Sequence, residues 1–417
     1  MRPGHLSLST AMAGILLAFP AAHAANPAFQ DFFFDVCQSP TGALAARCAE
    51  TTGATGDLSG DSESSLNPSQ NLSHQQPAIS VAQTRSKEAR ERGEKLRDGD
   101  SENGDAETGA AVVAGPFSLL VNVHGTWFDR DTDPATDSER GFDGSSEAVE
   151  IGFDHRLSDR TVLGGIVGFE RTDYEFDAEA EGFNFDPASV AGEADSDNLY
   201  LTLFASWRLG KRGYLELAGG YEQNEGSYRR NSVFQESNRT VAQTNVVVEG
   251  TADGDVQWAS LNGGFDIDRN AFSFGPYLGL TSTRANVDGY TERDLSGSGL
   301  NMSFAETERD SLLGHAGVRA SYVVSTARGI VMPQLRVEFQ REFEDDAQDA
   351  IARYALDASG TAYRLSGDAA DRDSINAGFS TAFVLPNGWM PFFDYSVLLA
   401  NDGLDRQRAT LGLRVEF

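Results

Sequence analysis

Apolar and polar residues alternate with a period of two through most of this 417-residue chain, from about residue 116 to its end. In the last stretch, one face of a strand would carry Ala409, Leu411, Leu413, Val415 and Phe417, while the intervening residues are Thr, Gly, Arg and Glu. A strand with one apolar and one polar face suits the wall of an outer-membrane barrel, with lipid outside and a wet lumen inside. Any half-buried strand alternates in the same way. This strand alone therefore does not distinguish a membrane barrel from a soluble protein, and the rest of the chain is needed.

The N-terminus predicts export. Residues 1–24 have a short basic start, an apolar core and the small-x-small pattern of a secretory signal, with cleavage expected between Ala24 and Ala25. The first cysteine, Cys37, lies too far along the chain for an N-terminal lipid anchor. No later apolar run approaches the roughly 18 residues that a membrane helix needs. The mature protein is therefore expected either to be soluble or to cross a membrane as strands.

The connections between the predicted strands differ systematically in length. Tight turns are expected at 157–160, 209–213, 268–270, 326–329 and 385–388, whereas the alternate connections are mostly long, as in 129–146, 175–196 and 229–255. Short periplasmic turns at one rim and long external loops at the other are typical of outer-membrane barrels. We predict twelve strands, near 117–128, 147–157, 161–172, 197–209, 213–226, 256–267, 271–284, 307–325, 329–343, 361–384, 388–399 and 406–417.

The faces of these strands support an all-β transmembrane barrel. Leu199, Leu201 and Leu203 alternate with Tyr200 and Thr202, and the stretch from 331 to 340 alternates in the same way, with its charges on the lumen side. Aromatic residues near strand ends would form interfacial girdles, as at Trp127, Trp207, Trp389 and Phe417. A large secreted sandwich is the alternative, but it would not require the asymmetry in loop length.

The net charge of the chain limits the kinds of molecule that it is expected to bind. The formal net charge of −30 argues against a nucleic-acid partner, because the phosphate backbone favours basic surfaces. The excess of carboxylates is expected to keep exposed loops soluble, with binding of cations as the alternative. The expected partner is outer-membrane lipid, the protein is expected to be monomeric, and no cofactor or metal is predicted.

Ahead of the barrel, composition divides the chain into three parts. Residues 25–78 are predicted to be mostly irregular and to carry a disulfide between Cys37 and Cys48, worth roughly 3 kcal/mol in an oxidising compartment. Residues 79–98 are rich in helix formers and predict a helix, interrupted only by Gly93. Residues 99–115 are predicted to be a linker, and residues 116–417 the barrel.

The chain resembles the translocator barrel of bacterial autotransporters, the type V secretion proteins. Four stretches carry the resemblance, and the helix precedes them: FGPYLGL at 274–280, DGYTE at 288–292, PQLRVEFQREF at 333–343 and LGLRVEF at 411–417. The resemblance implies a protein of the outer membrane whose helix runs through the lumen to a surface segment. It also implies that the assembly machinery, with periplasmic chaperones, reads a C-terminal signal formed by Leu411, Leu413, Val415 and Phe417.

Three further expectations accompany this resemblance. A helix in the lumen could pair Arg85, Lys87, Arg90 and Glu94 with Glu150, Arg208 and Glu216, whereas a helix outside the pore would not. The segment before the helix is far shorter than the repetitive passengers of the family and contains no repeat. Because residues 79–98 contain no Asn, self-cleavage at an Asn pair in the helix is not expected.

No catalytic set emerges. The strings at 56–59 and 60–63, GDLS and GDSE, resemble a GDSL-type esterase block, but they lack the preceding apolar strand and the later Asp-x-x-His. The acidic residues from Asp129 to Asp137 suggest a calcium loop, yet the sixth and twelfth positions hold Pro134 and Arg140. His124 and His315 are expected to make hydrogen bonds in the lumen. The prediction is a non-enzymatic barrel that exports or displays a short segment; a barrel-embedded surface hydrolase or a passive pore is the alternative.

Overall fold

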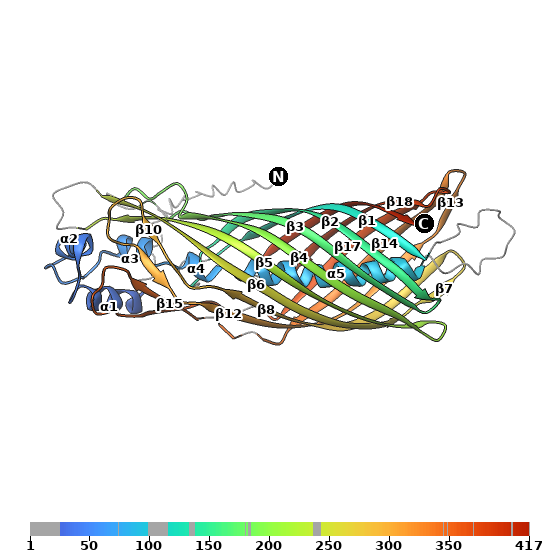
Figure 1. Ribbon diagram of the computed structural model, residues 1–417. Helices are drawn as coiled ribbons and strands as arrows, with labels where there is room; N and C mark the ends of the chain where they lie inside the picture. The colour runs from blue at the N-terminus through green and yellow to red at the C-terminus, as the bar shows by residue number, and fades with distance from the viewer. Residues whose placement is uncertain are drawn as a thin grey trace, which may run out of the picture.

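The computed structural model describes residues 26–73, 75–98, 116–132, 138–179, 181, 185–236, 243–344, 346–347, 349–369, 371–401 and 403–416. The predicted signal peptide with Ala24 and Ala25, the predicted linker 99–115 and Phe417 lie outside these residues. Within them, twelve long strands form the closed antiparallel barrel that the sequence predicts (Figure 1). They are β1 (Phe117–Arg130), β2 (Phe142–Ser158), β3 (Thr161–Phe176), β4 (Gly192–Leu209), β5 (Gly213–Phe234), β6 (Thr244–Phe265), β8 (Phe272–Val287), β12 (Thr307–Tyr322), β14 (Gly329–Glu342), β17 (Asp373–Val384), β18 (Trp389–Leu399) and β19 (Asp405–Glu416).

The barrel closes through its last strand. β19 pairs antiparallel with β1, with Leu413 opposite Val121 and Leu411 opposite Val123, and β6 pairs with β8. Closure matters because an unpaired strand edge would leave backbone groups without hydrogen-bond partners in lipid. The short turns lie at the rim that carries β7 (Ile267–Arg269), β13 (Val324–Thr326) and the C-terminus (Figure 1).

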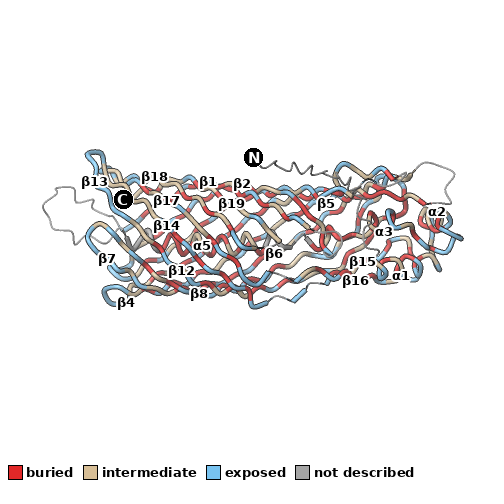
Figure 2. Tube along the Cα trace, turned by 180° about the vertical axis from the view of Figure 1, so that it is seen from behind, coloured by how far each residue is buried: buried red, intermediate tan, exposed pale blue. Residues whose placement is uncertain are grey.

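Buried and exposed residues alternate along the strands of the wall, as the sequence predicts (Figure 2). Leu203 is 59% exposed while its neighbour Phe204 is 6% exposed, and Leu335 is 61% exposed while Arg336 is 4% exposed. The exposed faces are apolar and meet lipid, while the opposite faces carry charge and point inward.

Strands β5 and β6 are much longer than predicted. Each has 22 residues, about twice what a tilted strand needs to cross a bilayer. The predicted long loop 229–255 is therefore wrong: most of it continues the β5–β6 hairpin beyond the membrane. The extension is stable because its inward face is covered, with Val233, Val246 and Val248 at most 2% exposed.

A second sheet of four short strands lies beside this hairpin, in the order β16–β15–β11–β9. The predicted strand 361–384 is consequently wrong as a single element, since its first part belongs to this sheet and the rest is β17. β10 pairs with β6 near the same place. The short strands are β9 (Tyr290–Thr291), β10 (Arg293–Asp294), β11 (Met302–Phe304), β15 (Asp349–Tyr354) and β16 (Tyr363–Ser366).

The segment ahead of the barrel is helical, and the prediction that it is mostly irregular is wrong. Phe29, Phe32, Phe33 and Val36 recur at helical spacing on one buried face, and Asn26 caps the N-terminus of this helix by accepting a hydrogen bond from the Phe29 amide. The helices are α1 (Pro27–Val36), α2 (Gly42–Glu50), α3 (Gly60–Leu66), α4 (Gln70–Ser73) and α5 (Gln75–Asp98).

The predicted helix 79–98 is confirmed, but it begins four residues earlier. Pro77 lies in its first turn, where a helix tolerates proline because the amide there has no intrahelical partner. In the described part of the chain, no helix combines the length and the apolar character needed to cross a bilayer.

Candidate functional site: the lumen helix and the surface cap

Helix α5 lies inside the barrel (Figure 1). It contacts β4, β5, β6, β8 and β12, and its 24 residues extend for about 36 Å, enough to cross a hydrocarbon core of about 30 Å. The alternative of a helix outside the pore is thereby excluded. Its direction follows from the chain: α5 starts at the end of the barrel with the extended hairpin and ends at the short-turn rim, where β1 begins.

Buried ion pairs fix α5 to the wall on several sides. Arg85 pairs with Glu222 and, at 3.3 Å, with Glu170. Arg90 pairs with Glu338 at 2.6 Å, Arg92 with Asp154 at 2.5 Å, Glu91 with Arg336 at 2.6 Å, and Glu88 with Arg408.

Further hydrogen bonds complete the attachment. The Ser86 and Thr281 hydroxyls are 2.9 Å apart, and the Lys87 ammonium donates to the Asn376 amide oxygen at 2.8 Å. Removing one partner of a buried pair leaves a charge without compensation and costs roughly 3–5 kcal/mol. The barrel therefore holds α5 in one orientation.

For Arg85 and Arg90, the partners in the wall are different from the expected ones. Glu150 accepts a hydrogen bond from the Tyr200 hydroxyl at 2.6 Å, and the arginines pair with carboxylates that the sequence did not single out. Glu216 lies against Gly93, where an added Cβ would come within 2.1 Å of its Oε1 atom. Gly93 thus allows the helix to approach the wall closely. The side chain of Glu94 lies outside the described part of the chain.

The two lumen histidines also join the wall to the helix or to its partners. His315 Nε2 is 2.7 Å from both Arg90 Nη1 and Asn262 Oδ1. His124 Nε2 is 3.3 Å from Glu170 Oε2, and Glu170 in turn pairs with Arg85. These contacts agree with the predicted hydrogen-bonding role.

Glu88, His124 and Glu150 come close enough to suggest a metal site, since their ligand atoms lie within 4.8 Å of one another. However, the Arg408 guanidinium already bonds to the Glu88 oxygen in this group. A second cation there would compete with it at short range, so we assign no metal to these residues.

At the opposite end from the short turns, helices α1 to α4 form a surface cap with the extended hairpin and the four-stranded sheet (Figure 1). The cap has its own apolar core. Phe32 stacks on Tyr354 and Tyr363 of that sheet, with ring centroids 5.6 and 5.0 Å apart. Its buried members include Phe29, Phe33, Val36, Leu44, Leu66, Leu72, Phe234, Val246, Val248, Leu300, Met302, Phe304, Leu365 and others.

Serine side chains of the cap cover an open strand edge. The pairing of β5 with β4 ends at Gly192 and Arg230, followed by one bond from the Asn231 amide to the Ala191 carbonyl, and no strand of the described residues pairs with that side of β5 further along. The Ser65 hydroxyl accepts a hydrogen bond from the Val233 amide at 2.8 Å, and the Ser62 hydroxyl contacts both the amide and the carbonyl of Gln235, at 2.8 and 2.7 Å. Buried Ser62 thus has a structural partner, which explains the GDSE string without nucleophilic chemistry.

A carboxylate reinforces this contact. The Ser59 amide donates to both carboxylate oxygens of Glu236 at 3.1 Å. Burial raises the pKa of Glu236, and the hydrogen bond from the Ser59 amide partly opposes this shift.

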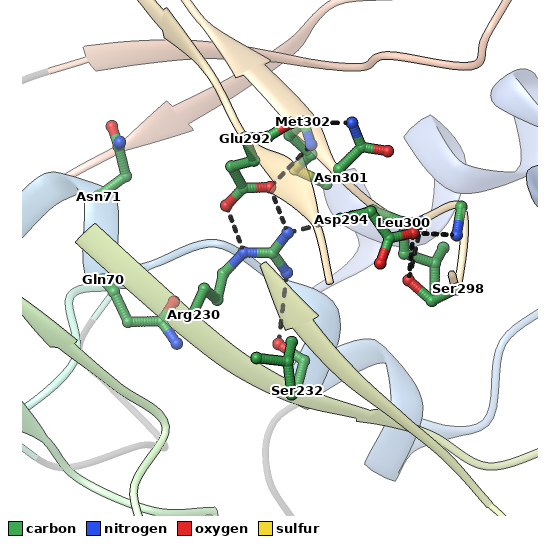
Figure 3. Close-up of polar contacts among 12 residues, drawn as sticks. Gln70, Asn71, Arg230, Ser232, Glu292, Asp294, Ser298, Leu300, Asn301 and Met302 are labelled. Carbon is green, nitrogen blue, oxygen red and sulfur yellow. Dashed lines mark hydrogen bonds and ion pairs between the residues drawn. The ribbon is translucent and has the colours of Figure 1, made fainter. Parts of the chain in front are cut away.

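A buried ion pair shapes the loop that receives the N-terminal helices (Figure 3). Arg230 donates to Glu292 through two hydrogen bonds, at 2.9 and 2.7 Å, and to the Leu300 carbonyl at 3.1 Å. Glu292 also accepts from the Met302 amide at 2.7 Å. The same loop brings Gly299 against α2, and Cys37 and Cys48 join α1 to α2 with their Cα atoms 5.5 Å apart. Sequence reasoning missed Arg230 and Glu292, which are separated by 62 residues and have no local signature.

Comparison with known families agrees with this architecture. The family model described as the autotransporter beta-domain matches residues 97–396, well over half of the chain. The chain belongs to the autotransporter β-domain family. It is thus an outer-membrane protein of type V secretion, as the resemblance implied.

Solved structures of autotransporter domains are similar to this chain. The translocator domain of autotransporter NalP from Neisseria meningitidis is 15% identical, with a TM-score of 0.56, and the match covers 82% of this chain and 98% of that one. The beta domain of the Bordetella autotransporter BrkA is 15% identical with a TM-score of 0.46, covering 73% of this chain and 100% of that one. The transport unit of AIDA-I from Escherichia coli is 12% identical with a TM-score of 0.48, covering 72% and 90%. Comparison with curated protein sequences finds no match.

Proposed function

We propose that this autotransporter barrel displays its own N-terminal segment as a folded cap on the outer surface of the cell. The single observation that carries the proposal is the packing of residues 26–73 at the rim opposite the short turns, on strands that continue beyond the membrane. Short turns of outer-membrane barrels are periplasmic, so the opposite rim is external. The cap would remain attached because α5 connects it to the barrel through the lumen.

The proposed activity is not enzymatic. His124 and His315 lie in contacts that hold the lumen helix, and Ser62 is bonded to the backbone of β5. A catalytic group would need to reach a substrate, whereas these side chains are at most 7% exposed. Insertion is proposed to depend on periplasmic chaperones and on the barrel assembly machinery, which would read the strand containing Leu411, Leu413, Val415 and Phe417, and the inserted protein is proposed to be a monomer.

Surface labelling of intact cells tests the display. An epitope inserted between Gly53 and Ala54, in an exposed turn of the cap, should bind antibody without permeabilisation. The matched control carries the same epitope between Pro386 and Asn387, in a short turn at the other rim, and should be labelled only after permeabilisation. The proposal fails if the cap epitope also requires permeabilisation while heat-modifiable mobility shows a folded barrel.

A further inference from the structure

A cavity opens at the cap end of the lumen, away from the cap core. Its volume is about 260 Å³, comparable to that of about nine molecules of liquid water, and it lies between the first turns of α5 and the ends of β1, β12, β14, β17, β18 and β19. The proposed display of the N-terminal segment does not involve this cavity.

The cavity has an apolar part. Ile79 of α5 faces Leu313 and Leu398 of the wall across it, and each of these side chains is at most 7% exposed. The cavity could therefore hold an aliphatic group of a few carbon atoms away from water.

A buried arginine with one unused hydrogen-bond donor also lines the cavity. Arg309 is 9% exposed, and its Nη1 atom is buried without any hydrogen-bond partner in the described part of the chain. Glu139 and Glu342 attract this guanidinium, but each also has other partners: Glu139 pairs with Arg130 at 3.1 Å, and Glu342 accepts from the Ser311 hydroxyl and the Leu312 amide, both at 2.7 Å. A buried guanidinium donor left without a partner is costly, and a carboxylate is the group that satisfies it best.

The rim of the cavity is predominantly acidic, although exposed Arg372 also lines it. Asp131, Asp371 and Glu344 line it and are exposed to solvent. These groups would attract a cation to the mouth, while Arg309 would attract an anion to the interior.

We propose that this cavity binds a small zwitterion of the α-amino-acid class with an aliphatic side chain. The carboxylate of the ligand contacts Arg309, its ammonium group faces the acidic rim, and its side chain packs between Ile79, Leu313 and Leu398. The site lies on the surface side of the lumen helix and so is supplied from outside the cell.

Isothermal titration of the purified full-length barrel in detergent tests the three parts of this ligand separately. L-leucine is the zwitterionic probe, 4-methylpentanoate lacks only its ammonium group, and 3-methylbutylamine lacks only its carboxylate. Leucine should bind, and each analogue should bind about tenfold more weakly or worse, because each loses one charged contact. Equal binding of 4-methylpentanoate would overturn the zwitterion, and absence of leucine binding would overturn the site.

A pair of variants locates the binding. Arg309→Gln should weaken the binding of leucine by about tenfold or more. The control is Arg171→Gln, which removes an arginine more than half exposed on the outer face of β3, outside the lining of the cavity, and should leave leucine binding unchanged. Heat-modifiable mobility confirms that both variants are folded. Equal effects of the two substitutions, or no effect of Arg309→Gln, would contradict a site in this cavity.

Discussion

At the scale of single residues, the packing of the cap requires a glycine where a loop approaches α2. Gly299 has a φ of +79°, and an added Cβ would lie 2.5 Å from the Leu44 amide nitrogen and 2.7 Å from the Ala43 carbonyl carbon. Both atoms belong to the backbone of α2 and cannot rotate away. Gly297, two residues earlier, has a similar φ of +68° with nothing near its would-be Cβ.

This pair of glycines gives a matched test. Gly297→Ala should destabilise the loop only through its left-handed backbone, by about 1–2 kcal/mol. Gly299→Ala should cost a further 1–3 kcal/mol or so, because α2 must move away. Hydrogen exchange of the α2 amides should accelerate much more in Gly299→Ala. Equal exchange in the two variants would show that the loop and α2 are not packed together.

The stability of the cap depends on Arg230 and Glu292 in a different way, through their opposite charges. Arg230→Met should destabilise the cap by roughly 3–5 kcal/mol, because it leaves the Glu292 carboxylate buried without its cation. Replacing both residues by Met should restore most of this loss, because neither charge then remains. Protease resistance of the cap measures both effects. A double variant as sensitive as Arg230→Met would show that the pair contributes through its own hydrogen bonds rather than by mutual neutralisation.

At the scale of elements, α5 performs two tasks at once. Its side chains occupy the lumen and form ion pairs with the wall. The helix is also long enough to connect the cap to the short-turn rim, where β1 begins. The long β5–β6 hairpin complements it from outside, since it supplies the wall on which α1, α3 and the short sheet assemble. The cap and α5 are therefore both packed against strands of the barrel.

Replacing residues 79–98 with an equally long Gly/Ser linker separates the plug from the tether. The linker keeps the connection but loses the ion pairs and the helical rod, so single-channel conductance in planar bilayers should rise above that of the wild-type barrel. Arg171→Gln, which changes an exposed arginine on the outer face of β3, serves as the control and should conduct like wild type. An unchanged conductance after the replacement would mean that α5 does not occlude the pore.

At the scale of the whole molecule, closure of the barrel joins the first strand to the last. β19 pairs with β1 along almost its full length, and neither edge remains open. The C-terminal strand can therefore have two roles, one in the folded wall and one as the signal that the resemblance implies.

Phe417→Asp separates these roles. A charge at the shallow rim should cost about 1 kcal/mol or less, so the folded barrel should keep its stability. If the residue is read during assembly, the amount of protein in the outer membrane should nevertheless fall sharply and periplasmic degradation should rise. The control is Trp389→Asp, which places the same charge on the adjacent strand opposite Val415 and should have little effect on abundance. Equal abundance of both variants would make Phe417 a packing residue only.

The sequence alone determined the barrel. Strand number, the rim of the short turns, the lipid-facing residues and the helix from about residue 79 all follow from local periodicity, because each depends on neighbours one to four positions away in the chain. The closing pair of strands is also predictable, since a membrane barrel cannot leave an edge open. Family membership then followed from a few short stretches in the right order.

Only the tertiary structure decided what lies above and within the barrel. The partners of Arg85 and Arg90, the pair of Arg230 with Glu292 and the cavity at Arg309 each join side chains that are tens to hundreds of residues apart. The cap helices were missed because they have only four to ten residues, too few to be stable or clearly periodic on their own, and α3 is also rich in Ser. They form because Phe29, Phe33 and Leu44 are buried in a core shared with the short sheet and the β5–β6 hairpin, whose residues lie far away in the sequence.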